Sequence, residues 1–198
     1  MTRIAAGALP APTLILALAL CLAGCGGGRY RAVSDWPVRV GKPYTVRGVT
    51  YVPAADPTFD VLGYAGWYGS ESGNRTALGE RFRPKWPTAA HPTLPLPTYL
   101  EVTALDTGRT VLVRVNDRGP FARGRVLDLS RGAAELLGMR RQGVAPVRLR
   151  RVEPPEASRA RLRRGKPVPG GQRPSDAALA NLRAQLAAGV QSGVVQAP

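Results

Sequence analysis

Residues 110–121, TVLVRVNDRGPF, join the clearest strand pattern of this 198-residue chain to a turn that contains charged residues. Val111, Val113 and Val115 alternate with other residues, and alternation places them on one face of a β-strand. The Asn-Asp-Arg-Gly sequence that follows is typical of a turn. Asp117 therefore lies where an apolar strand ends and a loop opens, a position from which a carboxylate can face a groove.

Short strand patterns surround this stretch and predict a small, mainly β domain over residues 61–152. Apolar or alternating segments bounded by turn residues occur at 64–69, 100–104, 126–129 and 144–152. Ser130 has the chemistry of a helix N-cap, and Gly138 ends the short helix that it begins. We expect a compact six-stranded barrel with one short helix, because closure removes sheet edges that so small a domain cannot cover.

The amino terminus has the features of an export signal. Residues 13–23 are apolar, but they are too few to span a bilayer, which takes about 20 residues. They end in Leu22-Ala23-Gly24-Cys25, which resembles the lipobox of bacterial lipoproteins; an ordinary secretory signal with a chance cysteine is the alternative. We expect a signal peptide over residues 1–24 and a lipid on Cys25, which anchors the chain to a membrane without spanning it.

Lipidation also accounts for both cysteines of the chain. Cys21 lies in the segment that is removed and Cys25 carries the lipid, so no thiol remains for a disulfide, a nucleophile or a metal site. Gly26, by resemblance to enterobacterial lipoproteins, favours the outer membrane over the plasma membrane, with the protein facing the periplasm. We therefore expect a fold that is held by packing alone.

The formal net charge is +15, and arginine supplies most of it. Such a charge often indicates nucleic-acid binding, but an exported, membrane-anchored protein rarely meets nucleic acid. Attraction to anionic envelope surfaces is one interpretation, and a GC-rich genome that favours arginine is the other. We predict a monomer without a nucleic-acid partner.

The segments on either side of the barrel lack sustained periodicity. Residues 25–60 are rich in glycine and proline and are predicted to be a flexible linker, with a short hairpin around Arg47-Gly48. Residues 153–198 form a basic, proline-rich tail that we expect to be partly disordered. Ser175 can cap a helix with leucines at helical spacing, which we interpret as helical tendency in a tail rather than as a helix docked on the barrel.

Five motifs in order resemble the RlpA family of rare lipoproteins. They are Gly66-Trp67-Tyr68-Gly69, residues 76–82 (TALGERF), residues 88–95 (TAAHPTLP), residues 115–121 (VNDRGPF) and residues 124–130 (GRVLDLS). The resemblance implies a double-psi β-barrel and, in active members, a lytic transglycosylase, a carbon–oxygen lyase that cleaves peptidoglycan glycan strands and prefers strands stripped of their peptides. A barrel of the expansin or barwin kind, which binds glycan without cutting it, is the alternative.

The implied reaction needs few groups. A proton must reach the leaving glycosidic oxygen, and an oxocarbenium-like transition state must be stabilised. The muramic acid 6-hydroxyl attacks C1 and forms a 1,6-anhydro ring, so one carboxyl can act first as acid and then as base. The resemblance assigns this role to Asp117, with Glu80 as a second groove carboxylate and His91 as a hydrogen-bonding partner of Asp117 or of the substrate. A turn aspartate, a surface glutamate and a core histidine are the respective structural alternatives.

Four further residues are expected to contact the glycan. Tyr68 and Trp67 have rings suited to stacking on sugars; successive strand residues point to opposite faces, and we favour Tyr68. Thr76 belongs to the motif that contains Glu80. Arg118 is expected either at the lactyl group of muramic acid or in an internal ion pair.

Other polar residues have structural interpretations. Asp128 is expected to pair with Arg118 or Arg125. One histidine and no available cysteine speak against a metal site, and the chemistry implies no cofactor.

The chain departs from the family pattern in three places. It has Leu96-Pro97-Thr98 where the family has Phe-Gly-Thr, and proline excludes a positive φ near His91. Residues 71–75 lack the aromatic-His-Gly pattern of the family. The tail is too short for the C-terminal SPOR domain of larger members, so we do not expect targeting through that domain.

Overall fold

The computed structural model describes residue 2 and residues 30–69 and 73–198, so the signal segment and Cys25 lie outside the described residues. The elements in chain order are β1 (Tyr44–Val46), β2 (Val49–Tyr51), β3 (Asp60–Tyr68), β4 (Thr88–Ala90), β5 (Thr98–Ala104), β6 (Thr110–Asp117), β7 (Arg125–Ser130), α1 (Arg131–Leu137), β8 (Ala145–Arg151), α2 (Glu156–Arg163) and α3 (Asp176–Gln191). In the described part of the chain, no helix has the length and apolar character needed to cross a membrane.

Six strands close into a barrel in the order β3-β7-β4-β6-β5-β8. β3 runs parallel to β7 and β4 runs parallel to β6, while the other neighbours are antiparallel. The predicted six-stranded barrel with a short helix is confirmed. Strand β4 is not apparent in the sequence, because the three residues Thr-Ala-Ala are too few to show alternation. It nevertheless joins β6 to β7 and completes the closure.

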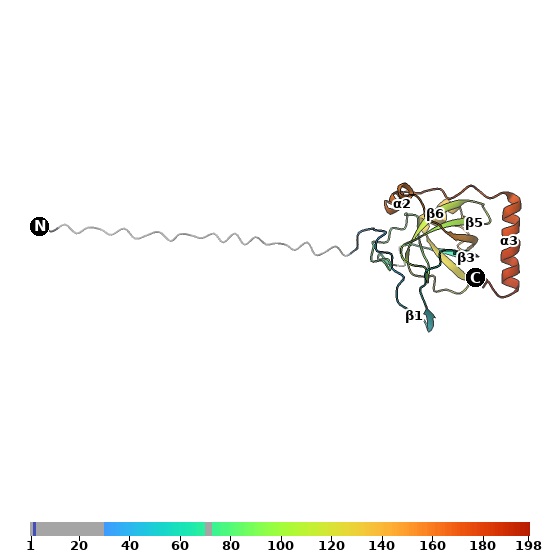
Figure 1. Cartoon of the computed structure of the whole chain (residues 1–198), viewed down its shortest axis with the longest axis horizontal. Coiled ribbons are helices and arrows are strands. Elements are labelled where there is room, and N and C mark those ends of the chain that lie inside the picture. Colours follow the sequence, from blue (N-terminus) through green and yellow to red (C-terminus); the bar gives the residue numbers. More distant parts are fainter. Residues whose placement is uncertain (1, 3–29, 70–72) are drawn as a thin grey trace.

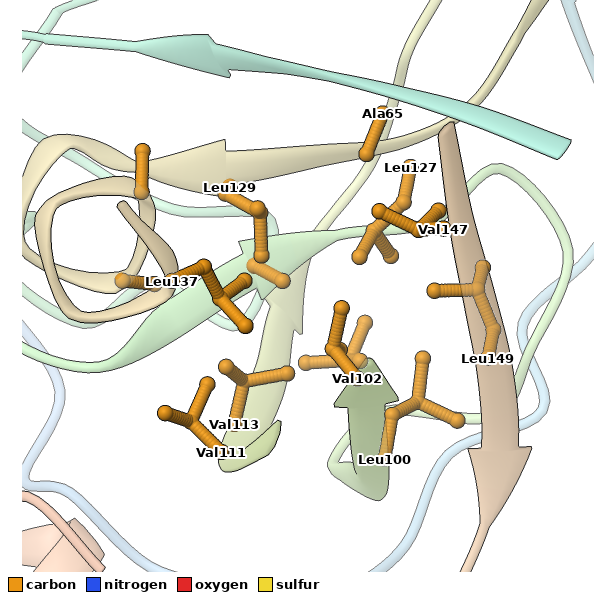
Figure 2. Close-up of a cluster of buried hydrophobic side chains, with 14 of the residues drawn as sticks. Ala65, Leu100, Val102, Val111, Val113, Leu127, Leu129, Leu137, Val147 and Leu149 are labelled. Carbon is orange, nitrogen blue, oxygen red and sulfur yellow. The ribbon is translucent and has the colours of Figure 1, made fainter. Parts of the chain in front are cut away.

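Side chains from every barrel strand fill one continuous core (Figure 2). Val111, Val113 and Val115 all belong to it, which confirms that they share one face of β6. Leucines of β5, β7 and β8 meet them from the other strands. Burial of so many aliphatic side chains is the main stabilising contribution to a domain of this size.

Helix α1 begins and ends where the sequence predicts. The Ser130 hydroxyl accepts a hydrogen bond from the backbone N–H of Ala133 at 3.1 Å, and Gly138 ends the helix with φ of 75°. Ala134 and Leu137 point from the helix into the barrel core. The helix therefore covers one end of the barrel.

Residues 30–59 form an arm that lies against the barrel, which corrects the expectation of a flexible linker. The backbone N–H of Arg31 donates to the carbonyl of Gly79 at 2.7 Å. Arg39 and Leu96 exchange two backbone hydrogen bonds, each 2.8 Å long. These contacts join residues more than 45 positions apart, so composition alone does not reveal them.

The predicted hairpin is present within this arm as β1 and β2. Its turn residues, Arg47 and Gly48, both have positive φ, as the tightest hairpin turns require. The hydroxyl of Tyr44 donates to the carbonyl of Pro92 at 2.7 Å and holds the hairpin near the barrel.

The C-terminal tail is also docked, which corrects the expectation of partial disorder. Helix α2 buries Leu162 in a cluster with Tyr99, and α3 buries Leu179 and Leu186 in a cluster with Leu105. Figure 1 shows α3 running along the side of the barrel. The arginine-rich composition of α2 resembles that of a disordered segment, but a few apolar contacts suffice to dock each helix.

Candidate functional site

Strand β4 brings two carboxylates to one level of the barrel surface. Ala90 of β4 pairs with Asp117 at the end of β6 on one side and with Asp128 of β7 on the other. The preceding pair, Ala89 and Leu129, is fully buried in the core. Because successive strand residues point to opposite faces, Ala90 and Asp128 face outward, and Asp117 lies beside them.

The Asp117 carboxyl group is largely buried and is held through one oxygen. Its Oδ1 accepts hydrogen bonds from the backbone N–H groups of Ala77 and Arg118, each at 2.8 Å. Burial raises the pKa of Asp117 above its ordinary value, although these two donors and the Arg118 charge oppose the rise. A carboxyl that retains its proton to higher pH than usual is suited to act as an acid.

Glu80 lies in a buried ion pair, which differs from the groove carboxylate that the family resemblance implies. Its two oxygens accept hydrogen bonds from the Arg114 guanidinium at 2.8 and 2.9 Å, and the Asn116 side chain donates a third at 2.8 Å. The residue is 2% exposed. Both oxygens of Glu80 are therefore engaged within the protein, and its role in this structure is to hold Arg114 and Asn116 in place.

Thr76 closes the loop that Glu80 holds. Its N–H donates to the Glu80 carbonyl at 2.9 Å, and its hydroxyl accepts from the Glu80 N–H at 3.2 Å. Ala77, whose N–H reaches Asp117, lies in the same loop. The buried Thr76 thus shapes the loop that orients Asp117, rather than presenting its side chain to a substrate.

His91 is a buried acceptor rather than a partner of the Asp117 carboxyl. Its Nδ1 accepts hydrogen bonds from the backbone N–H groups of Thr93 at 3.2 Å and Leu94 at 3.0 Å. Burial, together with the Arg118 charge, lowers the pKa of His91 to about 3. The ring is therefore neutral, with its proton on Nε2. Its link to Asp117 within the described residues runs through the backbone, where the His91 N–H donates to the Asp117 carbonyl at 3.1 Å.

The guanidinium of Arg118 donates hydrogen bonds to backbone carbonyls. One nitrogen donates to His91 O at 3.2 Å and to Leu94 O at 2.5 Å, and the other donates to Val40 O at 3.0 Å. These bonds join the His91 turn to the N-terminal arm. None of these bonds is the expected internal ion pair, and the expected contact with the lactyl group of muramic acid stays a prediction.

The two aromatic residues expected to stack on sugars are both engaged within the protein. Tyr68 stacks on Phe82 with ring centroids 4.7 Å apart and is 9% exposed. Trp67 donates from Nε1 to the carbonyl of Arg140 at 3.1 Å, and the Arg140 guanidinium lies over its ring. The preference for Tyr68 as a stacking platform therefore finds no support in its burial.

Asp128 lies across β4 from Asp117. It pairs with Arg125, as one of the two expected partners, and Nη2 donates to Oδ2 at 3.1 Å. Burial raises the pKa of Asp128, and the Arg125 charge opposes the rise. The available signal was a lone acidic residue inside the apolar run of Val126 to Leu129. The sequence does not show that Asp128 lies opposite Asp117, because that position depends on the pairing of both residues with Ala90.

A cleft of about 1200 Å³ lies between the barrel and α3. His91 and Arg125 line it from the barrel, and Leu182 and Gln185 line it from the helix. Arg125 also pairs with Asp128, although neither Asp128 nor Asp117 lines the cleft.

In residues 30–69 and 73–198, no group of three or more His, Cys, Asp or Glu side chains is placed to hold a metal ion. The predicted lack of a metal and of a cofactor stays a prediction.

Residues 60–149, which span β3 to β8, match the family described as lytic transglycolase. The match and the closed barrel make this domain a double-psi β-barrel of that class. Over 158 residues the chain is 39% identical to a protein of Rickettsia felis named endolytic peptidoglycan transglycosylase RlpA, with 69% of each chain covered. This chain therefore belongs to the RlpA family.

Other relatives carry the same name but are longer. The protein of Pseudomonas aeruginosa strain UCBPP-PA14 is 47% identical over 129 residues, which are 64% of this chain and 37% of that protein. Among solved structures, the Streptomyces papain inhibitor aligns with a TM-score of 0.41 and 23% identity, over 49% of this chain and 98% of that chain. A likeness of that size carries no argument about function.

Proposed function

We propose that this protein is an endolytic peptidoglycan lytic transglycosylase, which cuts glycan strands and leaves 1,6-anhydromuramic acid ends. The observation that carries the proposal is Asp117, a buried carboxyl group with a raised pKa at the outer surface of the barrel. The names of the relatives support the substrate class.

The contacts of Asp117 suit the first half of this reaction. Both backbone donors bind Oδ1, so Oδ2 is the oxygen that carries the proton toward the leaving glycosidic oxygen. A carboxyl group whose pKa is raised by burial is the kind of acid that glycoside cleavage uses elsewhere. The buried Arg114–Glu80 pair supports it indirectly, by holding the loop whose Ala77 N–H fixes Oδ1.

The cellular setting is part of the proposal. The apolar run and the Leu22-Ala23-Gly24-Cys25 sequence support a lipid anchor on Cys25, with the barrel in the periplasm and the outer membrane favoured over the plasma membrane. We further propose that the substrate is glycan stripped of peptides and that the protein acts as a monomer without a nucleic-acid partner.

The test is digestion of purified peptide-free glycan strands, followed by mass analysis of the fragments. The wild type should release fragments with anhydro ends, and Asp117→Asn should lower the rate by roughly 10²–10⁴-fold, the usual contribution of a general acid. Asp106→Asn is the matched control, because Asp106 is exposed in the β5–β6 turn. It should retain the wild-type rate.

Intact strands that nevertheless bind the wild-type protein would refute the enzyme and indicate a glycan-binding barrel of the expansin or barwin kind. Fragments with reducing ends in place of anhydro ends would indicate a hydrolase.

A further inference from the structure

Exposed apolar side chains are concentrated in the N-terminal arm. Of the seven large hydrophobic side chains that are exposed in the described part of the chain, five lie between residues 36 and 52. A single exposed apolar residue is ordinary on a protein surface, whereas a gathered set indicates an interaction site. We call these five residues the arm patch: Trp36 is 82% exposed, Val38 51%, Val40 43%, Val49 53% and Val52 60%.

The backbone turns three of these side chains to one side. Arg39 forms an antiparallel bridge with Leu96, and the two residues exchange backbone hydrogen bonds. Because successive residues of an extended chain point to opposite faces, Val38 and Val40 face away from the side chain of Arg39. They line a groove of about 390 Å³ together with Trp36, and proline and alanine side chains also line it.

The hairpin extends the arm patch. Val49 begins β2, and Val52 directly follows that strand. Gly41 lies against Pro53, since a Cβ atom at Gly41 would be 3.6 Å from Cγ of Pro53. The end of segment 36–40 and the base of the hairpin therefore meet. Figure 1 shows the hairpin projecting beyond the barrel, where a flat surface can reach it.

Positive charge accompanies the arm patch. Residues 36–52 contain Arg39, Lys42 and Arg47 but no aspartate or glutamate. All three cations are exposed, and within residues 30–69 and 73–198 none of them forms an ion pair. Arg31 and Arg39 also line a second hollow, which Trp36 borders from the same segment. The exposed indole is thus flanked by guanidinium groups.

The carboxylates beside the groove are already engaged. Three of them line it, and each accepts a hydrogen bond within the protein: Asp35 from Arg114, Asp56 from Thr58, and Glu153 from Arg151. Two of these three partners are guanidinium groups, which offset the negative charge. The unpaired cations of the arm therefore dominate the electrostatic potential at the arm patch.

This charge distinguishes between possible partners. A second copy of the chain would set the cations of one arm against the same cations of the other, because a symmetric dimer interface is self-complementary. A phospholipid bilayer with anionic headgroups instead attracts arginine and lysine. Its interfacial layer also favours tryptophan, and it accepts small aliphatic side chains.

We propose that the arm patch is a membrane-contact surface, which lies on an anionic phospholipid bilayer. Trp36 and the valines enter the interfacial layer, while Arg39, Lys42 and Arg47 contact lipid phosphates. If Cys25 carries the proposed lipid, the anchor holds the arm at the bilayer and the contact fixes which face of the barrel is turned to the wall. The inference depends on neither the lipid nor the proposed transglycosylase activity.

The experiment measures whether Trp36 reaches the bilayer. The mature protein is mixed with vesicles of phosphatidylethanolamine and phosphatidylglycerol, in which some acyl chains are brominated close to the headgroup. Bromine quenches the fluorescence of tryptophan rings that enter the bilayer. The wild type should be quenched, and most of this quenching should be absent from Trp36→Phe, which retains Trp67 and Trp86.

The contribution of charge is measured in the same assay. The triple variant Arg39→Gln, Lys42→Gln, Arg47→Gln should shift the ratio of docked to undocked arms by about tenfold or more toward the undocked form. Omission of phosphatidylglycerol should act in the same direction. Val194→Ser is the matched control, because Val194 is 83% exposed but lies in the C-terminal tail. It should be quenched as the wild type is.

Equal quenching of the wild type and Trp36→Phe would overturn the inference, and so would quenching that does not depend on phosphatidylglycerol. A dimer of the wild type in sedimentation experiments that Trp36→Ser dissociates would also overturn it, because a second copy would then cover the arm patch. Trp36→Ser should keep the wild-type rate on peptide-free glycan strands in solution. Loss of the membrane contact and failure of the proposed function are therefore separate results.

Discussion

Arg114 is 1% exposed, and its guanidinium binds two segments of the chain at once. It donates to Glu80 in the 76–80 loop, to Asp35 in the arm at 2.9 Å, and to the carbonyl of Ser34 at 2.6 Å. A buried cation with this many acceptors tolerates burial, but the loss of one acceptor leaves charge uncompensated. Mutation of Glu80 should therefore reduce the stability of the fold, whether or not Glu80 contacts the substrate.

Glu80→Gln should lower the free energy of unfolding by about 3 kcal/mol, because it removes the charge opposite a buried arginine. Urea denaturation measures this. Glu135→Gln, which breaks an exposed pair with Arg140, should cost less than about 1 kcal/mol. Unchanged stability with lost activity would instead return Glu80 to the role of a groove carboxylate.

His91 makes stability depend on pH through its lowered pKa. The folded protein binds a proton at His91 only near pH 3, whereas the unfolded chain binds one near pH 6.5. Between these values the unfolded state holds more protons, so this contribution is present above pH 6.5 and is lost as the pH falls toward 3.

His91→Gln should therefore flatten the fall in stability between pH 6.5 and pH 4.5, by roughly 1.4 kcal/mol per pH unit. Glutamine keeps an acceptor oxygen for the turn but does not titrate. Unfolding curves of both proteins over this range give the difference directly, and the buried aspartates contribute equally to both. Parallel curves would mean that His91 is solvated when folded.

At the scale of elements, α3 is the part of the tail whose docking has the clearest energetic consequence. Leu179 is 1% exposed and packs with Leu105, and Leu62 and Tyr64 of β3 lie against the same cluster. The hydrogen bonds from Arg183 to the carbonyl of Leu105 add a polar contact. The helix therefore covers outer residues of β3 that a bare barrel would expose.

Leu179→Ala should lower the free energy of unfolding by about 3 kcal/mol, the usual cost of a buried leucine truncation. Val194→Ala, in the same tail but 83% exposed, should change it by less than about 0.5 kcal/mol. Chemical denaturation of the two variants is the measurement. An undocked tail would make them indistinguishable.

The elements also show where sequence reasoning works. Strand β6, helix α1 and the Arg47-Gly48 turn were predictable, because alternation, capping and positive φ are local properties. Strand β4 was not, since it has no pattern of its own and exists through its neighbours. The arm and the tail were misjudged for the same reason: their docking depends on contacts between distant residues.

The candidate site was likewise predictable where local motifs define it and not where contacts between distant residues do. The resemblance of motifs identified the segments that meet, and Asp117, Glu80, His91 and Arg118 do lie in one region of the barrel. Their separate contacts could not be predicted, because Glu80 faces an arginine 34 positions away and Arg118 reaches Val40 across 78 positions. The position of Asp128 opposite Asp117 could not be predicted either, because β4 creates it.

For the whole molecule, the net charge of +15 predicts salt-sensitive attachment to anionic wall polymers. Binding of the inactive Asp117→Asn protein to isolated sacculi should fall about tenfold or more as sodium chloride rises from about 0.05 to about 0.5 M, because screening shortens the range of the attraction. A pull-down assay measures the bound fraction without digestion of the wall. Binding that ignores salt would indicate that groove contacts dominate.

The docked arm limits how far this molecule can travel from its anchor. Arg31 is fixed to the barrel by its hydrogen bond to Gly79, and only five residues lie between it and Cys25. Fully extended, they reach about 20 Å. If Cys25 carries the lipid, as proposed, the barrel is held within about 20 Å of the bilayer, and the proposed activity would reach only glycan that lies directly against the membrane.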